Sequence, residues 1–523
     1  MKRTILLKQI MLPILFLAAT LSATAQTPIE DSNLTWKLDG ETLTISGTGA
    51  MPDFDVNEGI NPPWYADRNS VTAIVVENGV TNIGDWAFYN CTNAISAQIP
   101  AGVESIGFIA FGYCYKLKDI TIPGSVKSLG IGAFNYCQAL ETITIPDEVT
   151  DISDSLFDGC ENLTTVTILG SVKSIGEFAF SSCLKLNNFI VPEGVESIGA
   201  FAFQECKALT TINIPASVTT IATDVFNLCS SLASITVDAG NNTYSSDGGV
   251  LFNKTKTELL VYPGGGNVNY TIPENVTGIG TSAFFGNETL TSVVIPNNVT
   301  SIGEKAFGWC SGLNSITILR LTPASVAFTP TSRATFRNAN VNCTVTVPTS
   351  AVDDYKAADG WNYFTDIVGG GCLVVAASNN NEYGSVSGNN ALCQSGETAT
   401  FTALAAEGYT FINWTVEGLE VSTEAAYSFS VAEDLELVAN FENTTSLESP
   451  TVAKEIQIYP SQITDYFQVK GISGQATVTV YTVFGKAVLQ REAASEENIY
   501  VGDLSAGMYL ITVDKKAFKV VKK

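Results

Sequence analysis

Histidine is absent from this chain of 523 residues. A Ser-His-Asp triad therefore cannot form, and the chain lacks both the usual proton acceptor at neutral pH and a common zinc ligand. The sequence also contains no phosphate-binding glycine loop, no Cys-x-x-Cys pair and no nucleophile elbow. We therefore expect a protein that is not an enzyme, with no catalytic residue, no metal site and no cofactor.

Positive charge is scarce. The chain has 27 basic and 52 acidic residues, and three of the basic ones, Lys2, Arg3 and Lys8, lie in the first 25 residues. Without that segment the formal charge becomes 24 − 52 = −28. A surface of this charge repels phosphate, so we expect no nucleic acid among the partners.

Long apolar runs are missing except near the N-terminus. Residues 1–25 begin with basic residues, continue with an apolar run from Ile10 to Ala19 and end at Ala23-Thr-Ala25. These three parts are typical of a secretory signal peptide, and the run is too short to span a membrane. We predict that residues 1–25 are a cleaved signal peptide.

What the sequence has in abundance is a repeat of 23 residues. In each copy a Leu-x-x-Ile-x-Ile-Pro stretch alternates apolar and polar residues, which predicts a strand that ends at proline. Copies start at Val103, Val126, Val149, Val172, Val195, Val218, Val276 and Val299, with a degraded copy at Val80. A period this short indicates a solenoid, in which stacked coils pair their strands in a parallel sheet.

Phenylalanine and cysteine recur at fixed slots of the repeat. We interpret the phenylalanines as a stacked spine in the core. We interpret the cysteines as buried free thiols, because Asn287 fills the same slot in one copy and either side chain can satisfy backbone groups inside a turn. The cysteines in this slot are Cys91, Cys114, Cys137, Cys160, Cys183, Cys206, Cys229 and Cys310.

The pattern Ile-Gly-x-x-Ala-Phe-x-x-Cys-x-x-Leu-x-x-Ile-x-Ile-Pro resembles the BspA-like (Treponema-type) leucine-rich repeat family. The stretch from Leu34 to Gly47 reads as a hairpin and resembles the family's N-terminal cap, which we place in residues 26–70. The solenoid, with a C-terminal cap, is then expected in residues 71–368. An insertion near residues 238–272 is either a hairpin that continues the sheet or a binding element.

The outward positions of the predicted strands form the candidate ligand face. They carry short hydroxyl, amide and acid side chains, which suit either a soluble half-exposed strand or a binding surface for protein or glycan. The candidate ligand face comprises Asp119, Thr121, Thr142, Thr144, Thr165, Thr167, Asn188, Thr211 and Asn213.

Aromatic residues at variable positions around the spine form the candidate aromatic patch. They are either exposed, where aromatic rings anchor interfaces and stack on sugars, or partly buried against neighbouring coils. The candidate aromatic patch comprises Phe108, Tyr113, Tyr136, Phe178, Phe201 and Trp309.

Residues 369–443 follow a glycine boundary and alternate in short runs. The stretch from Gly408 to Trp414 and the ending Ala439-x-Phe441 resemble the divergent internalin-B-type repeat, which implies a small β-grasp-like domain. Pairing of residues 373–378 with 384–388 as a hairpin would bring Cys372 near Cys393. These two cysteines are either a disulfide or two free thiols.

Residues 444–453 are polar and read as a linker. Residues 454–523 contain Ile458-Tyr459-Pro460 and the run from Leu504 to Tyr509, and they resemble the C-terminal sorting domain of the type IX secretion system. The resemblance implies an Ig-like β-sandwich, recognition by that secretion machinery, passage across the outer membrane and attachment to surface lipopolysaccharide.

Taken together, these features predict a β-rich protein with short helical turns, made of a leucine-rich-repeat solenoid, a small β-grasp-like domain and an Ig-like sandwich. We expect a secreted or cell-surface binding protein. The resemblance implies an adhesin that binds proteins of the host matrix or of other cells, and the hydroxyl and aromatic positions leave glycan binding as the alternative.

Overall fold

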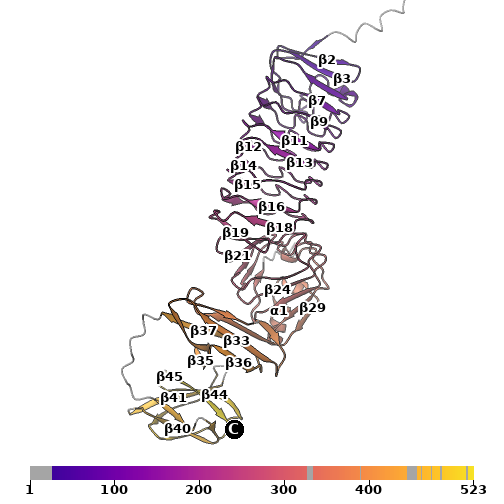
Figure 1. Ribbon diagram of the computed structural model, residues 1–523. Coiled ribbons are helices and arrows are strands. Elements are labelled where there is room, and N and C mark those ends of the chain that lie inside the picture. Colours follow the sequence, from indigo (N-terminus) through magenta and orange to yellow (C-terminus); the bar gives the residue numbers. More distant parts are fainter. Residues whose placement is uncertain are drawn as a thin grey trace, which may run out of the picture.

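Stacked coils form a rod over most of the chain, and two smaller β-rich units follow it (Figure 1). The computed structural model describes residues 26–326, 334–388, 390–443, 456–460, 462–472, 474–482, 486–513 and 516–523. The predicted signal peptide, residues 1–25, and the predicted linker, residues 444–453, lie outside the described residues. We call residues 371–443 the middle domain and residues 456–523 the C-terminal domain.

A hairpin closes the N-terminal end of the rod. Its strands β2 and β3 pair antiparallel around Gly40, whose φ of 61° suits the tight turn. Trp64 lies under this hairpin, donates from Nε1 to the carbonyl oxygen of Ala87 at 2.8 Å and stacks on Phe88. The elements here are β1 (Thr27–Pro28), β2 (Leu34–Asp39), β3 (Thr42–Gly47), β4 (Gly49–Ala50) and the 3-10 helix η1 (Tyr65–Ser70).

Each coil has three walls, and the predicted strands form the first. Alternate residues of these strands are buried, and neighbouring strands are parallel, so that Thr142 pairs with Thr165, 23 residues on. The first-wall strands are β5 (Ala73–Val76), β7 (Ser96–Gln98), β9 (Asp119–Ile120), β11 (Thr142–Ile145), β13 (Thr165–Ile168), β16 (Thr211–Ile214), β18 (Ser234–Val237), β22 (Asn269–Thr271), β24 (Ser292–Ile295), β26 (Ser315–Ile318), β28 (Thr344–Val347) and β29 (Asp366–Gly369).

The first wall is not one continuous sheet, whereas the repeat predicts coils that pair their strands in a parallel sheet. Strand β9 does not pair with β11, and one isolated bridge, Asn188 to Thr211, replaces a full strand after β13. In that coil Phe189 fills the slot of an isoleucine and its ring contacts those of Phe180 and Phe203. We attribute the local loss of pairing to this larger side chain, because an overfilled core displaces the backbone.

Short strands form the second wall. Most are two residues long and each pairs in parallel with a neighbouring coil, although the pairing is interrupted after Leu129 and after Ile221. They are β6 (Val80–Ile83), β8 (Ser105–Ile106), β10 (Ser128–Leu129), β12 (Asp151–Ile152), β14 (Ser174–Ile175), β15 (Ser197–Ile198), β17 (Thr220–Ile221), β23 (Gly278–Ile279), β25 (Ser301–Ile302) and β27 (Ser325–Val326).

Consecutive turns form the third wall, and two slots per coil take left-handed backbone with φ between 51° and 73°. In one coil these slots hold Ile109 and Tyr113. Left-handed residues alternate here with residues of ordinary backbone conformation. As a result, the amides of Phe111 and Tyr113 donate to carbonyl oxygens of the next coil, both at 2.8 Å. The wall is thus a backbone ladder without strands, and it satisfies groups that burial would otherwise leave unpaired.

The insertion extends the second wall. Strands β19 (Tyr244–Asp247), β20 (Val250–Asn253) and β21 (Glu258–Val261) are antiparallel to one another, and β21 then pairs in parallel with β23. Its placement therefore agrees with the interpretation as a hairpin that continues a sheet. The rod closes at its C-terminal end with η2 (Ala334–Phe336), η3 (Thr349–Ala351), α1 (Val352–Ala357) and η4 (Trp361–Tyr363).

The phenylalanine spine fills the core between the walls. Adjacent rings stack from Phe88 to Phe226 at centroid distances of 5.1 to 5.8 Å, and a second run joins Phe284, Phe307 and Phe336. Trp361 ends this second run and donates to the carbonyl oxygen of Ala324 at 3.0 Å. A tryptophan therefore covers each end of the stack.

The middle domain has two sheets. One has the order β32-β30-β37-β34-β35 and the other β31-β33-β36, with Trp414 and Phe401 among the buried residues of its core. The strands are β30 (Cys372–Ser378), β31 (Gly384–Ser387), β32 (Ala391–Cys393), β33 (Thr398–Ala405), β34 (Tyr409–Val416), β35 (Leu419–Ser422), β36 (Ala426–Ser430) and β37 (Leu435–Asn443).

The C-terminal domain also has two sheets, of order β38-β40-β43 and β39-β45-β44-β41-β42. Val478, Ile511 and Phe467 are buried in its core. The strands are β38 (Gln457–Tyr459), β39 (Gln462–Ile463), β40 (Tyr466–Lys470), β41 (Gln475–Thr482), β42 (Ala487–Ala494), β43 (Asn498–Tyr500), β44 (Gly507–Val513) and β45 (Lys516–Lys522).

Candidate ligand-binding face of the solenoid

All nine residues of the candidate ligand face are exposed. They point outward from the first wall because the residues between them, such as Ile143 and Ile212, point into the core. The breaks in the sheet divide them into three groups. Asp119 and Thr121 precede the first break, four threonines of β11 and β13 lie between the breaks, and Asn188, Thr211 and Asn213 follow.

The parallel register places equivalent side chains of neighbouring coils side by side. Thr142 lies opposite Thr165, and Thr144 lies opposite Thr167. Further along, the Thr236 hydroxyl donates to Oδ1 of Asn213 at 2.9 Å, and Nδ2 of Asn213 donates to Asp238 at 3.1 Å. This end of the face is a hydrogen-bonded polar surface.

A groove of about 800 Å³ opens on the first wall over β5, β7 and β9. Ile74, Ile120 and Pro123 contribute apolar lining, whereas Gln98, Lys118, Asp119, Thr121 and Thr142 contribute polar lining. Within the described residues, neither Lys118 nor Asp119 forms an ion pair. Three members of the candidate ligand face thus line a groove that the repeat pattern alone did not predict.

An exposed isoleucine interrupts the polar face, and the sequence analysis missed it. Ile190 occupies the outward slot between Thr167 and Asn213, and 85% of it is exposed. Leu169, which replaces the usual proline in the preceding coil, is 62% exposed. The signal was present in the sequence, because Phe189-Ile190-Val191 breaks the alternation of apolar and polar residues.

The aromatic candidates occupy the third wall, where Tyr113, Tyr136, Phe178, Phe201 and Trp309 take left-handed slots. Tyr113 stacks on Tyr136 at 4.8 Å and Phe178 on Phe201 at 4.7 Å, so these rings are half-buried against neighbouring coils.

The ring of Phe108 contacts Trp86, Trp86 contacts Tyr89, and Tyr89 contacts Tyr113 of the Tyr113–Tyr136 pair. In the described chain no ring contact links Phe178, Phe201 or Trp309 to that group. Trp309 is 48% exposed.

The repeated cysteines are buried and unbonded. The thiol of Cys137 donates to the carbonyl oxygen of Phe111 in the preceding coil at 3.3 Å, and six other cysteines repeat this contact. Burial raises the pKa of Cys91 and Cys229 to about 12. Asn287 donates to Pro263 and accepts from Leu290, so it satisfies backbone groups as the interpretation of this slot expects.

Cys372 and Cys393 lie directly opposite each other, but on a different strand pair from the one predicted. Strand β30 pairs with β32 and β37, whereas β31 (Gly384–Ser387) pairs with β33, so the expected hairpin of 373–378 with 384–388 is wrong. Three residues separate β31 from β32, which returns to pair with β30. Both thiols are partly exposed and unbonded.

Two further features of the described residues bear on chemistry and location. No group of three or more acidic, cysteine or histidine side chains is arranged to hold a metal ion there. None of the helices in that part of the chain has the length and apolar character that a membrane span requires.

Comparisons with known proteins agree with the repeat pattern. A family model described as BspA type leucine-rich repeat region matches residues 58–174, 150–267 and 262–352, more than half of the chain. The divergent InlB B-repeat domain matches residues 374–445, and the secretion system C-terminal sorting domain matches residues 457–523. No curated protein matches the chain.

Solved structures of leucine-rich repeat proteins are also similar. A leucine rich cell surface protein from Faecalibacterium prausnitzii is 27% identical, with 66% of this chain and 96% of that one covered and a TM-score of 0.42. A leucine-rich repeat protein from Bacteroides ovatus is 20% identical, with 65% and 98% covered and a TM-score of 0.36. The pneumococcal vaccine antigen PcpA is 18% identical, with 65% and 98% covered and a TM-score of 0.36.

The sorting-domain match means that the chain is exported across the outer membrane to the cell surface by the type IX secretion machinery. The repeats provide a protein-binding scaffold there, and none of the matched families is enzymatic. By its repeats, which account for more than half of its length, the chain belongs to the BspA type leucine-rich repeat family.

Proposed function

We propose that this protein is an adhesin that binds a protein ligand of the host matrix or of another cell through the first wall of its solenoid. Ile190 is the observation that carries the proposal. Ile190 is 85% exposed and Leu169, one coil earlier, is 62% exposed, so the two offer an apolar anchor on a surface otherwise lined by polar residues.

The surroundings of Ile190 support a protein ligand. Thr167 and Asn213 flank it in the outward row, and Leu169 adds a second exposed apolar side chain one coil earlier. Protein interfaces combine a few apolar anchors with a polar rim in this manner. The groove over β5, β7 and β9 lies on the same wall and provides a second contact region for a long ligand.

Glycan binding is the second candidate, and exposed aromatic rings favour it. Sugars stack on an open ring face, but Tyr113, Tyr136, Phe178 and Phe201 cover one another's faces. Trp309, with 48% of its area exposed, is the member of the candidate aromatic patch best placed to contact a sugar.

For residence at the surface, we propose attachment to outer-membrane lipopolysaccharide after removal of the C-terminal domain. The support is the sorting-domain match at residues 457–523. Immunoblots of surface protein from the native bacterium should then show a heterogeneous, high-mass form that collapses to one band in a strain without lipopolysaccharide.

An array separates the two binding candidates. Residues 26–523 of the chain are applied to matrix proteins, to the same proteins after deglycosylation, and to purified glycans. The adhesin proposal expects binding that survives deglycosylation and that free sugars do not inhibit. Binding to glycans alone, lost on Trp309→Ala, would instead establish the second candidate.

A further inference from the structure

The middle domain and the end of the chain carry opposite charge. Residues 371–443 contain nine glutamates, one aspartate and neither lysine nor arginine. The last nine residues, 515–523, contain five lysines and no acid. Charges of opposite sign on two units of one chain attract over about 8 Å at physiological ionic strength.

The structure places these two segments in contact. Strand β35 of the middle domain, which carries Glu420, contacts strand β45 of the C-terminal domain, and the two lie close together in Figure 1. Nζ of Lys519 lies 6.0 Å from the ring centre of Tyr427. A lysine over a tyrosine face gains a cation–π attraction in addition to the general charge attraction.

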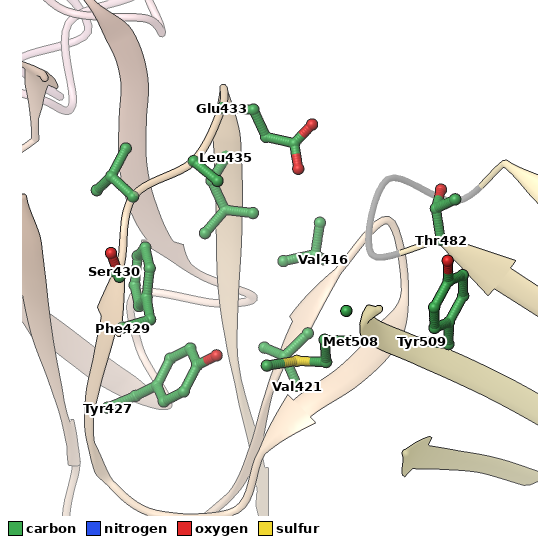
Figure 2. A pocket seen from close by; sticks show the side chains of 13 residues that line it. Val416, Val421, Tyr427, Phe429, Ser430, Glu433, Leu435, Thr482, Met508 and Tyr509 are labelled. Atoms are coloured by element: carbon green, nitrogen blue, oxygen red, sulfur yellow. The ribbon is translucent and has the colours of Figure 1, made fainter. Parts of the chain in front are cut away.

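An apolar cleft of about 520 Å³ separates the two domains beside this contact. Figure 2 shows Tyr427 and Phe429 of the middle domain on one side and Tyr509 of the C-terminal domain on the other, with Val421 and Met508 between them in this view. An unfilled cleft forfeits dispersion contacts, so the two surfaces meet without the close packing of a permanent interface.

Glu433 lies at the rim of the cleft (Figure 2). Burial, with a smaller contribution from the neighbouring Asp434, raises the pKa of Glu433 to about 7. Burial also raises the pKa of Tyr427. Both shifts agree with partial removal of this acidic face from water.

We propose that the middle domain is an intramolecular docking platform for the sorting domain, which it holds by attraction between its acidic, apolar face and the basic strand β45. The proposal does not rest on the adhesin function. Because the attraction is screened by salt and the cleft is unfilled, docking is reversible. The docked state covers one face of the sorting domain, so recognition of that face requires undocking.

Small-angle scattering of residues 26–523, which retain the C-terminal domain, tests the proposal. We expect the radius of gyration to increase between about 20 mM and about 500 mM sodium chloride, because the Debye length shortens severalfold. Lys519→Glu should give the larger radius already at low salt. Lys470→Glu makes the same charge change on β40, in the other sheet of the C-terminal domain, and should behave as the wild type.

Two results would overturn the proposal. One is a wild-type radius that does not respond to salt, a measurement that needs no variant and is independent of any effect of substitution on folding. The other is a salt response accompanied by a concentration-dependent dimer, which would mean that the acidic face holds the sorting domain of a second copy.

Discussion

At the scale of the residue, slots of the repeat are defined by backbone demands as much as by burial. The cysteine slot needs a donor to a backbone carbonyl of the preceding turn of the chain: the Cys137 thiol donates to Phe111, and the Asn287 amide donates to Pro263. The left-handed slots accept Tyr113 and Lys305 alike, because their side chains point away from the core. The residue type therefore varies at these slots because the side chains do not pack in the core.

The first prediction at this scale is a disulfide between Cys372 and Cys393. Paired residues of antiparallel strands have Cα atoms about 4.5–5.5 Å apart, which suits a disulfide, and secretion favours its formation. Alkylation of the native, unreduced protein should add no label. After denaturation without reduction, nine of the eleven cysteines should react.

The variant Cys372→Ser provides the control, because it frees Cys393 to take one label in the native state. Two labels on the native wild-type protein would show that the pair is reduced.

At the scale of the element, the spacing of coils depends on the glycine that follows the second-wall strand. A Cβ atom at Gly130 would lie 2.4 Å from the carbonyl carbon of Gly107 in the preceding coil. Ser153 and Ala222 fill the same slot in other coils, so a side chain there requires a local increase in spacing. The glycine is thus favoured by close packing.

Gly130→Ala should therefore destabilise the protein by about 1–3 kcal/mol, the usual cost of overfilling a packed site. Gly124→Ala is the matched control, because a Cβ atom there would have nothing within 4 Å. Chemical unfolding followed by circular dichroism measures both. Equal midpoints for the two variants would contradict this account of coil spacing.

Much of this element-level structure follows from the sequence. The alternation around Ile143 and Ile145 predicts the first-wall strands, and the period of 23 residues predicts their parallel register. The break after β13 does not follow, because it depends on how Phe189 fits between Phe180 and Phe203. The groove near Asp119 is not predicted either, although the strands β5, β7 and β9 beneath it pair in the expected parallel register.

The pairing of the middle domain was harder to predict. Strand β30 is a short apolar run without alternation, and its residues Leu373, Val374 and Val375 are all buried, so its sequence does not single out one partner. In the structure its partners are β32 and the distant β37, and Leu373 and Val375 pack against Leu319 at the end of the solenoid. Contacts over such sequence separations leave no periodic signal.

At the scale of the whole molecule, the chain is a binding rod joined to an export signal. The solenoid presents the candidate ligand face along its length, the middle domain follows it, and the C-terminal domain provides the sorting signal (Figure 1). The sequence predicts this order, because each unit has its own repeat or terminal pattern.

A chain that ends at Asn443 should remain in the periplasm, because it lacks the sorting domain. Accessibility to added protease on intact cells, with the full-length chain as the control, measures display. Normal cleavage of the truncated chain on intact cells would mean that export does not depend on residues 457–523.

The central claim is that the first wall binds a protein ligand around Ile190, and one comparison of affinities tests it. Ile190→Asp should weaken binding of the ligand found on the array by about tenfold or more, because a charge replaces an apolar anchor that the bound ligand would cover. Ile131→Asp makes the same substitution at another exposed isoleucine, 48% exposed and on the third wall, and should bind as the wild type. Equal affinity of Ile190→Asp and wild type would contradict the account.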